Sequence, residues 1–403
     1  MVVWPLVFLL ACNEGYVPEK PVVLQPLDAT ALEDVTRELT DLGPRMVATP
    51  AEEEATVLME TLFTEAGLVD VRREGFEWEA WVPGPARLEV GTDVYDALAL
   101  SPTPPTDGLT APMVLEGGDA SGAVLVVTGE GTSRGVQALG AATSGARGMI
   151  RVTEATTDDG DLLTEVGHTL MGLSLPSFAV DADTGAALRA RVGEDVRLYA
   201  DTELIEDHTS YNVLGEVPGT GAGRVFVTAH YDSWDPSESA ADNAVGVAAM
   251  VLMARRLADG PPPEPTVVFL ATGAEEQGLQ GALAYTDAHP AESGTAQMVL
   301  NLDVLWASEG TFLVMGSDPE WIGLALDVAD VEGLNAVAAG EPDPSSDNFA
   351  FQIAGSPAFW AGRFGYREYH THRDTIDTLN FERAARALRV QWAVLANEVG
   401  VPR

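Results

Sequence analysis

Short apolar runs alternate with helical stretches over the second half of the chain. The strand-like runs cover residues 225–229, 266–271, 298–302 and 311–315. Strands that are apolar without interruption are typically buried on both faces, and helices between them predict a mostly parallel sheet with helices on both sides. After Gly246 the apolar residues recur at helical spacing until Gly260 and three prolines end the pattern. The sequence therefore predicts an α/β fold.

The first half of the chain has a different texture. Helical periodicity covers residues 28–42 and resumes after Pro50, where three glutamates favour a helix N-terminus. Between about 98 and 200 the pattern changes to short β-rich runs separated by glycine, threonine and aspartate. We expect residues 99–200 to form a small inserted domain, and residues 20–98 together with 201–403 to form the main domain. The insert is expected to shape access to a cleft of the main domain.

An apolar run at residues 2–11 opens the chain. It is too short for a transmembrane helix, which needs about 20 residues. The run ends at Leu9-Leu10-Ala11-Cys12 and passes directly into polar residues, a pattern that resembles the lipobox of bacterial lipoproteins, although no basic residue precedes Lys20. We therefore expect residues 1–19 to be a signal, lipobox and linker. Lipidation of Cys12 would tether an exported protein to a membrane, and no other membrane contact is expected.

Composition limits the chemistry. The chain of 403 residues carries 22 Lys+Arg against 62 Asp+Glu, a net charge of −40, which argues against binding to nucleic acid. Its single cysteine excludes an intrachain disulfide and a cysteine-rich zinc module. Any bound metal must therefore be held by histidines and carboxylates.

Polar side chains follow three of the strand-like runs directly. They are His230 and Asp232 after the first run, Glu275 and Glu276 after the second, and Asp303 after the third. Ligands of open α/β sheets bind beyond the carboxyl ends of the strands, so these side chains are expected to converge. Clustered carboxylates repel one another, and a divalent cation is the simplest partner that stabilises them.

Asp242 and His370 add another carboxylate and another imidazole to this set. A mixture of histidines and carboxylates suits zinc better than calcium. If five ligands hold two ions, a carboxylate must bridge them, and two such ions can activate a water molecule between them. Glu275 and Glu276 are adjacent and cannot easily aim at one point. One is therefore expected to bind metal, and the other to accept a proton from the water.

The motifs at these positions resemble a known family. They are His230-Tyr231-Asp232-Ser233, Asp242-Asn243-Ala244-Val245-Gly246, Glu275-Glu276-Gln277-Gly278, Asn301-Leu302-Asp303, Ser346-Asp347 and Tyr369-His370-Thr371. Together they resemble the di-zinc exopeptidases of metallopeptidase family 28, which includes aminopeptidase Y, glutamate carboxypeptidase and glutaminyl cyclase. Members often carry a protease-associated (PA) domain, which the β-rich insert resembles. The resemblance implies a zinc exopeptidase fold with a PA-like insertion.

The same resemblance implies the arrangement of two Zn²⁺ ions. Asp242 would bridge them, His230 and Asp303 would complete one coordination sphere, and Glu276 and His370 would complete the other. No ligand would come from the insert.

Further roles follow from the resemblance. Glu275 would be the general base, and Tyr369 would polarise the carbonyl group under attack. Asp232 would orient the His230 ring, as carboxylates beside metal-binding histidines commonly do. The peptide bond between Asp242 and Asn243 is expected to be cis.

The leading functional prediction is an exported, zinc-dependent aminopeptidase that acts on peptides. One alternative on the same fold is an acyltransferase of the glutaminyl cyclase type. Another is a carboxypeptidase or dipeptidase, in which Arg363 and Arg367 would bind a substrate carboxylate, although surface ion pairing is the simpler role for both. A homologue that has lost catalysis would need broken ligands, and none of the expected ligands is replaced.

Overall fold

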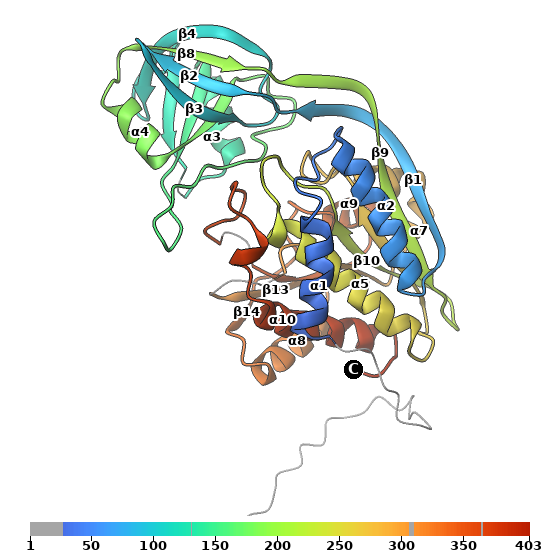
Figure 1. Ribbon diagram of the computed structural model, residues 1–403. Helices are drawn as coiled ribbons and strands as arrows, with labels where there is room; N and C mark the ends of the chain where they lie inside the picture. The colour runs from blue at the N-terminus through green and yellow to red at the C-terminus, as the bar shows by residue number, and fades with distance from the viewer. Residues whose placement is uncertain (1–26, 130, 306–309, 364–365) are drawn as a thin grey trace, which may run out of the picture.

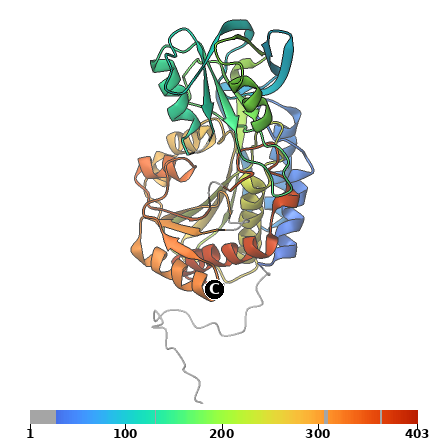
Figure 2. The same ribbon diagram turned by 90° about the vertical axis from the view of Figure 1, so that its left-hand side faces the viewer.

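The computed structural model describes residues 27–129, 131–305, 310–363 and 366–403. The predicted lipidation site, Cys12, lies outside the described residues. The chain folds into a closed β-barrel and an α/β part, which are joined by two long paired strands (Figure 1). Figure 2 shows the barrel at one end of the molecule and the C-terminus at the other.

The α/β part is built on a mixed sheet of eight strands, in the order β1-β9-β11-β10-β12-β15-β13-β14. In that order the strands are Val69–Val82, Glu203–Val217, Thr266–Thr272, Arg224–His230, Met298–Asn301, Ala358–Gly362, Phe312–Gly316 and Ala336–Ala338. The four inner strands β11, β10, β12 and β15 are parallel. The antiparallel pairs lie toward the edges, between β1, β9 and β11 and between β13 and β15. The α/β prediction is confirmed, and the four predicted strands are β10, β11, β12 and β13.

Helices cover both faces of this sheet. One face shares a large apolar core with α1 (Ala29–Thr40), α2 (Pro50–Glu65), α5 (Val245–Ala258), α8 (Pro319–Val331) and α10 (Phe381–Glu398). The other face packs against α6 (Gln280–Ala288) and α9 (Asn348–Ala354), next to the short α7 (Pro290–Ser293). Every residue of α5 from Val245 to Ala254 is buried, as expected for a helix that lies across the middle of a sheet.

The barrel contains seven strands in the closed order β2-β3-β7-β6-β5-β4-β8. In that order the strands are Ala86–Val90, Asp93–Ala99, Ser177–Asp181, Gly148–Thr153, Val124–Thr128, Thr106–Leu115 and Asp195–Ala200, and the barrel part also carries α3 (Arg134–Thr143) and α4 (Ala182–Arg189). Its interior is a separate apolar cluster.

The barrel begins at β2, before the boundary expected at residue 99. In β2, the buried Leu88 and Val90 alternate with the less buried Arg87 and Glu89. Because apolar and polar residues alternate in this strand, the composition of the chain does not change there. No sequence signal therefore placed the domain boundary before residue 99. The resemblance of the barrel to a PA domain stays a prediction.

The central strands should dominate stability. Leu300 lies in β12 and is fully buried in the main core. Leu300→Ala should lower the free energy of unfolding by about 2–5 kcal/mol, because truncation leaves a cavity between sheet and helices. Val331→Ala is the control, since this side chain is 84% exposed, and it should change stability by about 0.5 kcal/mol or less. Urea unfolding followed by circular dichroism measures both, and equal effects would contradict the prediction.

Candidate active site

The register of the parallel strands aligns the predicted site residues. His230, at the end of β10, pairs with Thr272, at the end of β11, and Thr228 pairs with Asn301 of β12. Asp303 follows β12 by two residues and therefore reaches the level of His230. Glu275 and Glu276 follow β11 and extend beyond the same edge. The convergence expected from the sequence is present in the structure.

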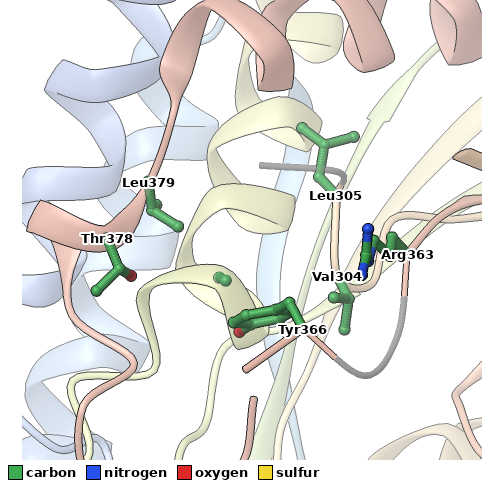
Figure 3. A pocket seen from close by; sticks show the side chains of 7 residues that line it. Val304, Leu305, Arg363, Tyr366, Thr378 and Leu379 are labelled. Carbon is green, nitrogen blue, oxygen red and sulfur yellow. The ribbon is translucent and has the colours of Figure 1, made fainter. Parts of the chain in front are cut away.

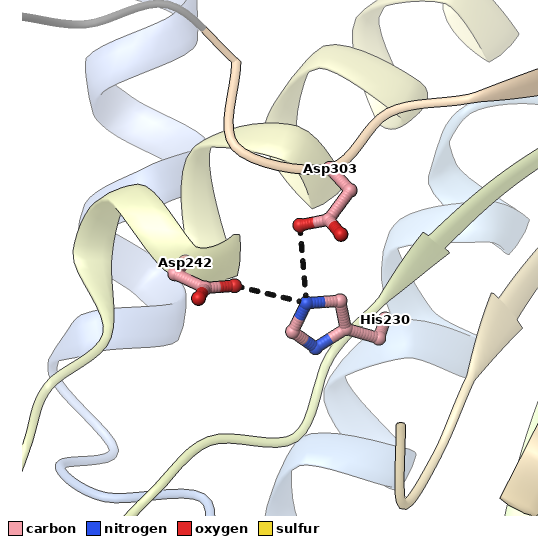
Figure 4. A group of neighbouring side chains, drawn as sticks. All are labelled: His230, Asp242 and Asp303. Atoms are coloured by element: carbon pink, nitrogen blue, oxygen red, sulfur yellow. Dashed lines mark hydrogen bonds and ion pairs between the residues drawn. The ribbon is translucent and has the colours of Figure 1, made fainter. Parts of the chain in front are cut away.

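The structure brings three of these side chains together in what we name the His230 group: His230, Asp242 and Asp303. Nε2 of His230 lies 3.1 Å from Oδ1 of Asp242 and 3.4 Å from Oδ1 of Asp303 (Figure 4). All three residues are buried. On the opposite side of the ring, Nδ1 lies 3.5 Å from Oδ1 of Asp232.

Asp242 also belongs to a second set, the His370 group, which consists of Asp242, Glu276 and His370. Nε2 of His370 lies 2.9 Å from Oδ2 of Asp242 and 3.5 Å from Oε2 of Glu276. The indole of Trp234 donates a hydrogen bond of 2.6 Å to Oε2 of Glu276. The two oxygens of Asp242 thus face the two imidazoles, one in each group.

The donor atoms fit metal ions. Burial raises the pKa of Glu276 well above its usual range, and the charge of Asp242 adds to this effect. Burial also favours the neutral form of Asp242, but hydrogen bonds from His230 and His370 lower its pKa below the usual value. Oε1 of Glu276 and Oδ1 of Asp303 are buried and have no hydrogen-bond partner among the described residues. Unpaired buried carboxylate oxygens beside imidazole nitrogens are the donor set that zinc prefers.

Glu275 lies next to these groups without belonging to either. Its Oε2 atom is 4.0 Å from Nε2 of His230, and burial raises its pKa well above the usual range. The backbone amides of Glu275 and Glu276 both donate to the carboxylate of Asp232, at 3.0 and 3.2 Å. Asp232 therefore ties the loop after β11 to the loop after β10.

The turn that carries Asp242 is held in place by hydrogen bonds to other segments of the chain. The carboxylate of Asp374 accepts hydrogen bonds from the backbone amides of Ala241, at 2.9 Å, and of Asp242, at 3.1 Å. The side-chain amide of Asn243 donates to the carbonyl of Leu302, at 2.8 Å. The peptide bond between Asp242 and Asn243 is cis, as the family resemblance implies.

Arg45 supports the preceding loop from inside the protein. Its fully buried guanidinium donates to the carbonyls of Tyr231, at 2.8 Å, Glu238, at 2.8 Å, and Ser239, at 3.2 Å. Burial lowers its pKa to about 10. One side chain therefore holds together the segment that leads from β10 to Asp242.

A cavity of about 560 Å³ opens onto both groups. Its apolar wall comes from α6, α9 and the residues before α6, and includes Leu279, Leu283, Phe349 and Ile353. Tyr369 also lines the cavity, with its ring centroid 4.2 Å from that of His370, and burial raises its pKa well above the usual value. The cavity therefore combines carboxylates, a phenol and an apolar surface.

Two lining residues from the insert were not singled out by sequence reasoning. They are Arg134, at the start of α3, and His168. Nδ1 of His168 lies 3.1 Å from the carbonyl oxygen of Glu276. Neither residue has a spacing relative to the ligands that could have identified it, because both belong to a separately folded part of the chain.

The two arginines weighed for a substrate carboxylate do not line this cavity. Arg363 borders a small pocket of about 10 Å³ next to Val304, Tyr366 and Leu379 (Figure 3). Arg367 forms an ion pair with Asp158. The structure therefore gives the carboxypeptidase alternative no support from this pair.

A mixed α/β sheet with two His–carboxylate groups beyond its strand ends is typical of a metal-dependent hydrolase. Residues 212–395 match the model of Peptidase family M28. This match confirms the resemblance to metallopeptidase family 28 over the segment that contains both groups.

Whole-chain comparisons agree with that family. Aminopeptidase YwaD of Bacillus subtilis (strain 168) is 28% identical over 383 residues, which cover 86% of this chain and 79% of that protein. Carboxypeptidase Q of Bos taurus is 25% identical and aligns over 88% of this chain and 82% of its own length. The crystal structure of BSAP, a zinc aminopeptidase from Bacillus subtilis, superposes with a TM-score of 0.73 at 25% identity, covering 93% of this chain and 96% of that one.

Arg45→Met should destabilise the protein strongly. The substitution leaves several buried carbonyl oxygens without a donor, and each such loss costs about 1–3 kcal/mol. We expect a loss of about 3 kcal/mol or more in thermal unfolding of the full chain. The control is Arg37→Met, which removes an exposed ion pair with Glu33 and should leave thermal unfolding nearly unchanged. A loss at Arg45 no larger than at Arg37 would contradict this role.

Proposed function

We propose that this protein is a zinc-dependent aminopeptidase that removes N-terminal residues from peptides and uses two Zn²⁺ ions. One observation carries the proposal. Asp242 is shared between the His230 group and the His370 group, and the non-ligating carboxylate of Glu275 lies beside the shared position. His230 and Asp303 would hold one ion, Glu276 and His370 the other, and Asp242 would bridge both.

Zinc bound in these groups would supply Lewis-acid activation of a water molecule and of the substrate carbonyl. Glu275 accepts the proton of the attacking water, because it is the buried carboxylate of the cleft that belongs to neither group. It then donates that proton to the nitrogen of the departing amine. The hydroxyl of Tyr369 donates to the carbonyl oxygen as negative charge develops there. Asp232 keeps the His230 ring in orientation.

The cavity suits a peptide with a free N-terminus. Asp242, Glu275, Glu276 and Asp303 make its inner end acidic, which attracts a protonated α-amine. The apolar wall of α6 and α9 lies beside these groups and can bury the first side chain. The aminopeptidase relatives support this choice over the carboxypeptidase and cyclase alternatives.

The activity can be tested directly with aminoacyl-4-nitroanilides. We expect release of nitroaniline from Leu-4-nitroanilide, and loss of this activity when the substrate amine is acetylated, because the acidic end of the cleft then lacks its cationic partner. N-blocked dipeptides with a free carboxylate test the carboxypeptidase alternative, and glutaminyl peptides test the cyclase alternative. Turnover of either of these substrates without hydrolysis of the free-amine substrate would overturn the assignment.

Glu275 and Glu276 should behave differently although they are adjacent and chemically alike. Glu275→Ala removes a proton acceptor, so kcat should fall about 10²–10⁴-fold while both zinc ions stay bound. Glu276→Ala removes a ligand, so zinc content should fall together with kcat. Elemental analysis and steady-state kinetics of the two variants measure both quantities. Loss of zinc in Glu275→Ala alone would reverse the roles, and full activity in both variants would refute the peptidase proposal.

We further infer export and lipid attachment at Cys12 from the Leu9-Leu10-Ala11-Cys12 pattern. None of the helices in the described part of the chain has the length and apolar character needed to cross a membrane. Expression of the full chain in a bacterial host with labelled palmitate should label the wild type and leave Cys12→Ser unlabelled. An unlabelled wild-type protein with Cys12 intact would refute this inference.

A further inference from the structure

A turn of the insert presents apolar side chains next to the cavity of the candidate active site. The turn covers residues 170–173 and is closed by a hydrogen bond of 3.0 Å from the amide of Leu173 to the carbonyl of Leu170. The side chains of Leu170 and Met171 are 40% and 39% exposed. Turns are usually rich in glycine, proline and small polar residues, so two exposed, large apolar side chains are unusual at this position.

Met171 lies at the edge of the cavity. A Cβ atom at Gly278 would lie 3.3 Å from Cγ of Met171, so the methionine side chain packs against this glycine. Gly278 lines the cavity, and so do Leu279 and Leu283, which follow it in the chain. The turn therefore continues the apolar wall of α6 and α9 toward the insert.

The residues that precede the turn hold it in a defined place. The backbone amide and the hydroxyl of Thr169 both donate to the carbonyl of Ser101, at 2.7 and 3.0 Å. Nδ1 of His168 lies 3.1 Å from the carbonyl oxygen of Glu276, and it is the donor because a carbonyl only accepts. The turn is therefore fastened both to the insert and to the loop that carries Glu275 and Glu276.

The order of these features determines which part of a peptide can reach the turn. In the function proposed above, the acidic inner end attracts the α-amine, and the wall of α6 and α9 buries the first side chain. Glu275 and Tyr369 act at the bond that is cleaved. The residue after that bond must extend toward the open side of the cavity, where the side chains of Leu170 and Met171 are partly exposed.

We propose that Leu170 and Met171 bind the side chain of the second residue of the substrate, so that the enzyme prefers peptides with an apolar residue at that position. This inference rests on the aminopeptidase function proposed above. An apolar second residue would cover the exposed side chains of the turn and remove apolar surface from water, whereas glycine would leave them exposed. The insert would then select substrates, although it contributes no metal ligand.

The experiment measures kcat/KM of the full-length, zinc-loaded protein for Leu-Phe-Gly, Leu-Gly-Gly and Leu-amide, which differ only after the bond that is cleaved. The wild type should prefer Leu-Phe-Gly over Leu-Gly-Gly about 10-fold, the factor expected for partial burial of an aromatic side chain. In Met171→Ser this preference should fall to about threefold or less, because the apolar contact is lost. Val192→Ser is the matched control and should keep the wild-type preference, since Val192 is a 42% exposed residue of the insert that does not line the cavity.

A second variant provides a gain of specificity, which a loss of folding cannot imitate. Met171→Lys would place a cation beside the second residue of the substrate. The ratio of kcat/KM for Leu-Glu-Gly to that for Leu-Phe-Gly should therefore rise about 3–10-fold over the wild-type ratio, because a partly exposed ion pair is gained and an apolar contact is lost. Thermal unfolding of each variant checks that the fold is retained.

The outcomes separate the two claims. A zinc-loaded wild type that hydrolyses none of these substrates overturns the proposed function, and the inference with it. Hydrolysis of all three without a preference for Leu-Phe-Gly overturns the inference alone, as does a preference that neither Met171→Ser nor Met171→Lys changes. Equal losses for the three substrates in Met171→Ser would assign this side chain to packing of the loop after β11, which also overturns the inference.

Discussion

The repulsion between buried carboxylates around Asp242 is the constraint on which the rest of the structure depends. Asp242, Glu276 and Asp303 are brought together with little solvent to separate their charges. Two imidazoles relieve part of the repulsion, since His230 faces one oxygen of Asp242 and His370 faces the other. A bound cation would pair with the carboxylate oxygens that have no hydrogen-bond partner in the described part of the chain. Because such a cluster would push its members apart, each one must be held by structure that lies behind it.

In the loops that follow the strands, these supporting contacts maintain strained backbone conformations. Ala274, Val304 and His370 all have positive φ, at 55°, 50° and 52°, and each is a candidate ligand or lies beside a carboxylate of the cleft. Such conformations cost about 1–3 kcal/mol each for residues with a side chain. Burial of the apolar core between the sheet and its helices offsets this free-energy cost. Contacts at the cleft hold the backbone in these conformations. Part of the backbone strain therefore lies where side chains must be aimed, although Ala48, Asp70 and Asp207, which do not line the cavity, also have positive φ.

The features that could be predicted from the sequence are those that local residue patterns encode. Unbroken apolar runs identified β10, β11 and β12, and the polar residues after them are those that the register aligns at one edge. Sequence reasoning did not reach Arg134, nor the indole of Trp234 that donates to Glu276. The position of Arg134 depends on how the barrel packs against the α/β part, and the position of Trp234 depends on how its loop folds back. Neither arrangement produces a periodicity or a residue spacing that can be recognised in the sequence. The early start of the barrel was missed for a related reason, since β2 resembles any half-exposed strand.

The long strands β1 and β9 explain why a loop of the insert can pair with the turn that carries His370. They pair with each other from Val69–Glu216 to Val82–Glu203, and β9 also pairs with β11, whose following loop carries Glu275 and Glu276. A two-stranded connection resists bending more than a single flexible linker does, because its ladder hydrogen bonds must break before the strands can splay. The barrel is therefore anchored in the same sheet that presents the site (Figure 1). A loop from such a barrel can hold the turn that carries His370 in a fixed geometry, which a tethered, freely moving domain could not do.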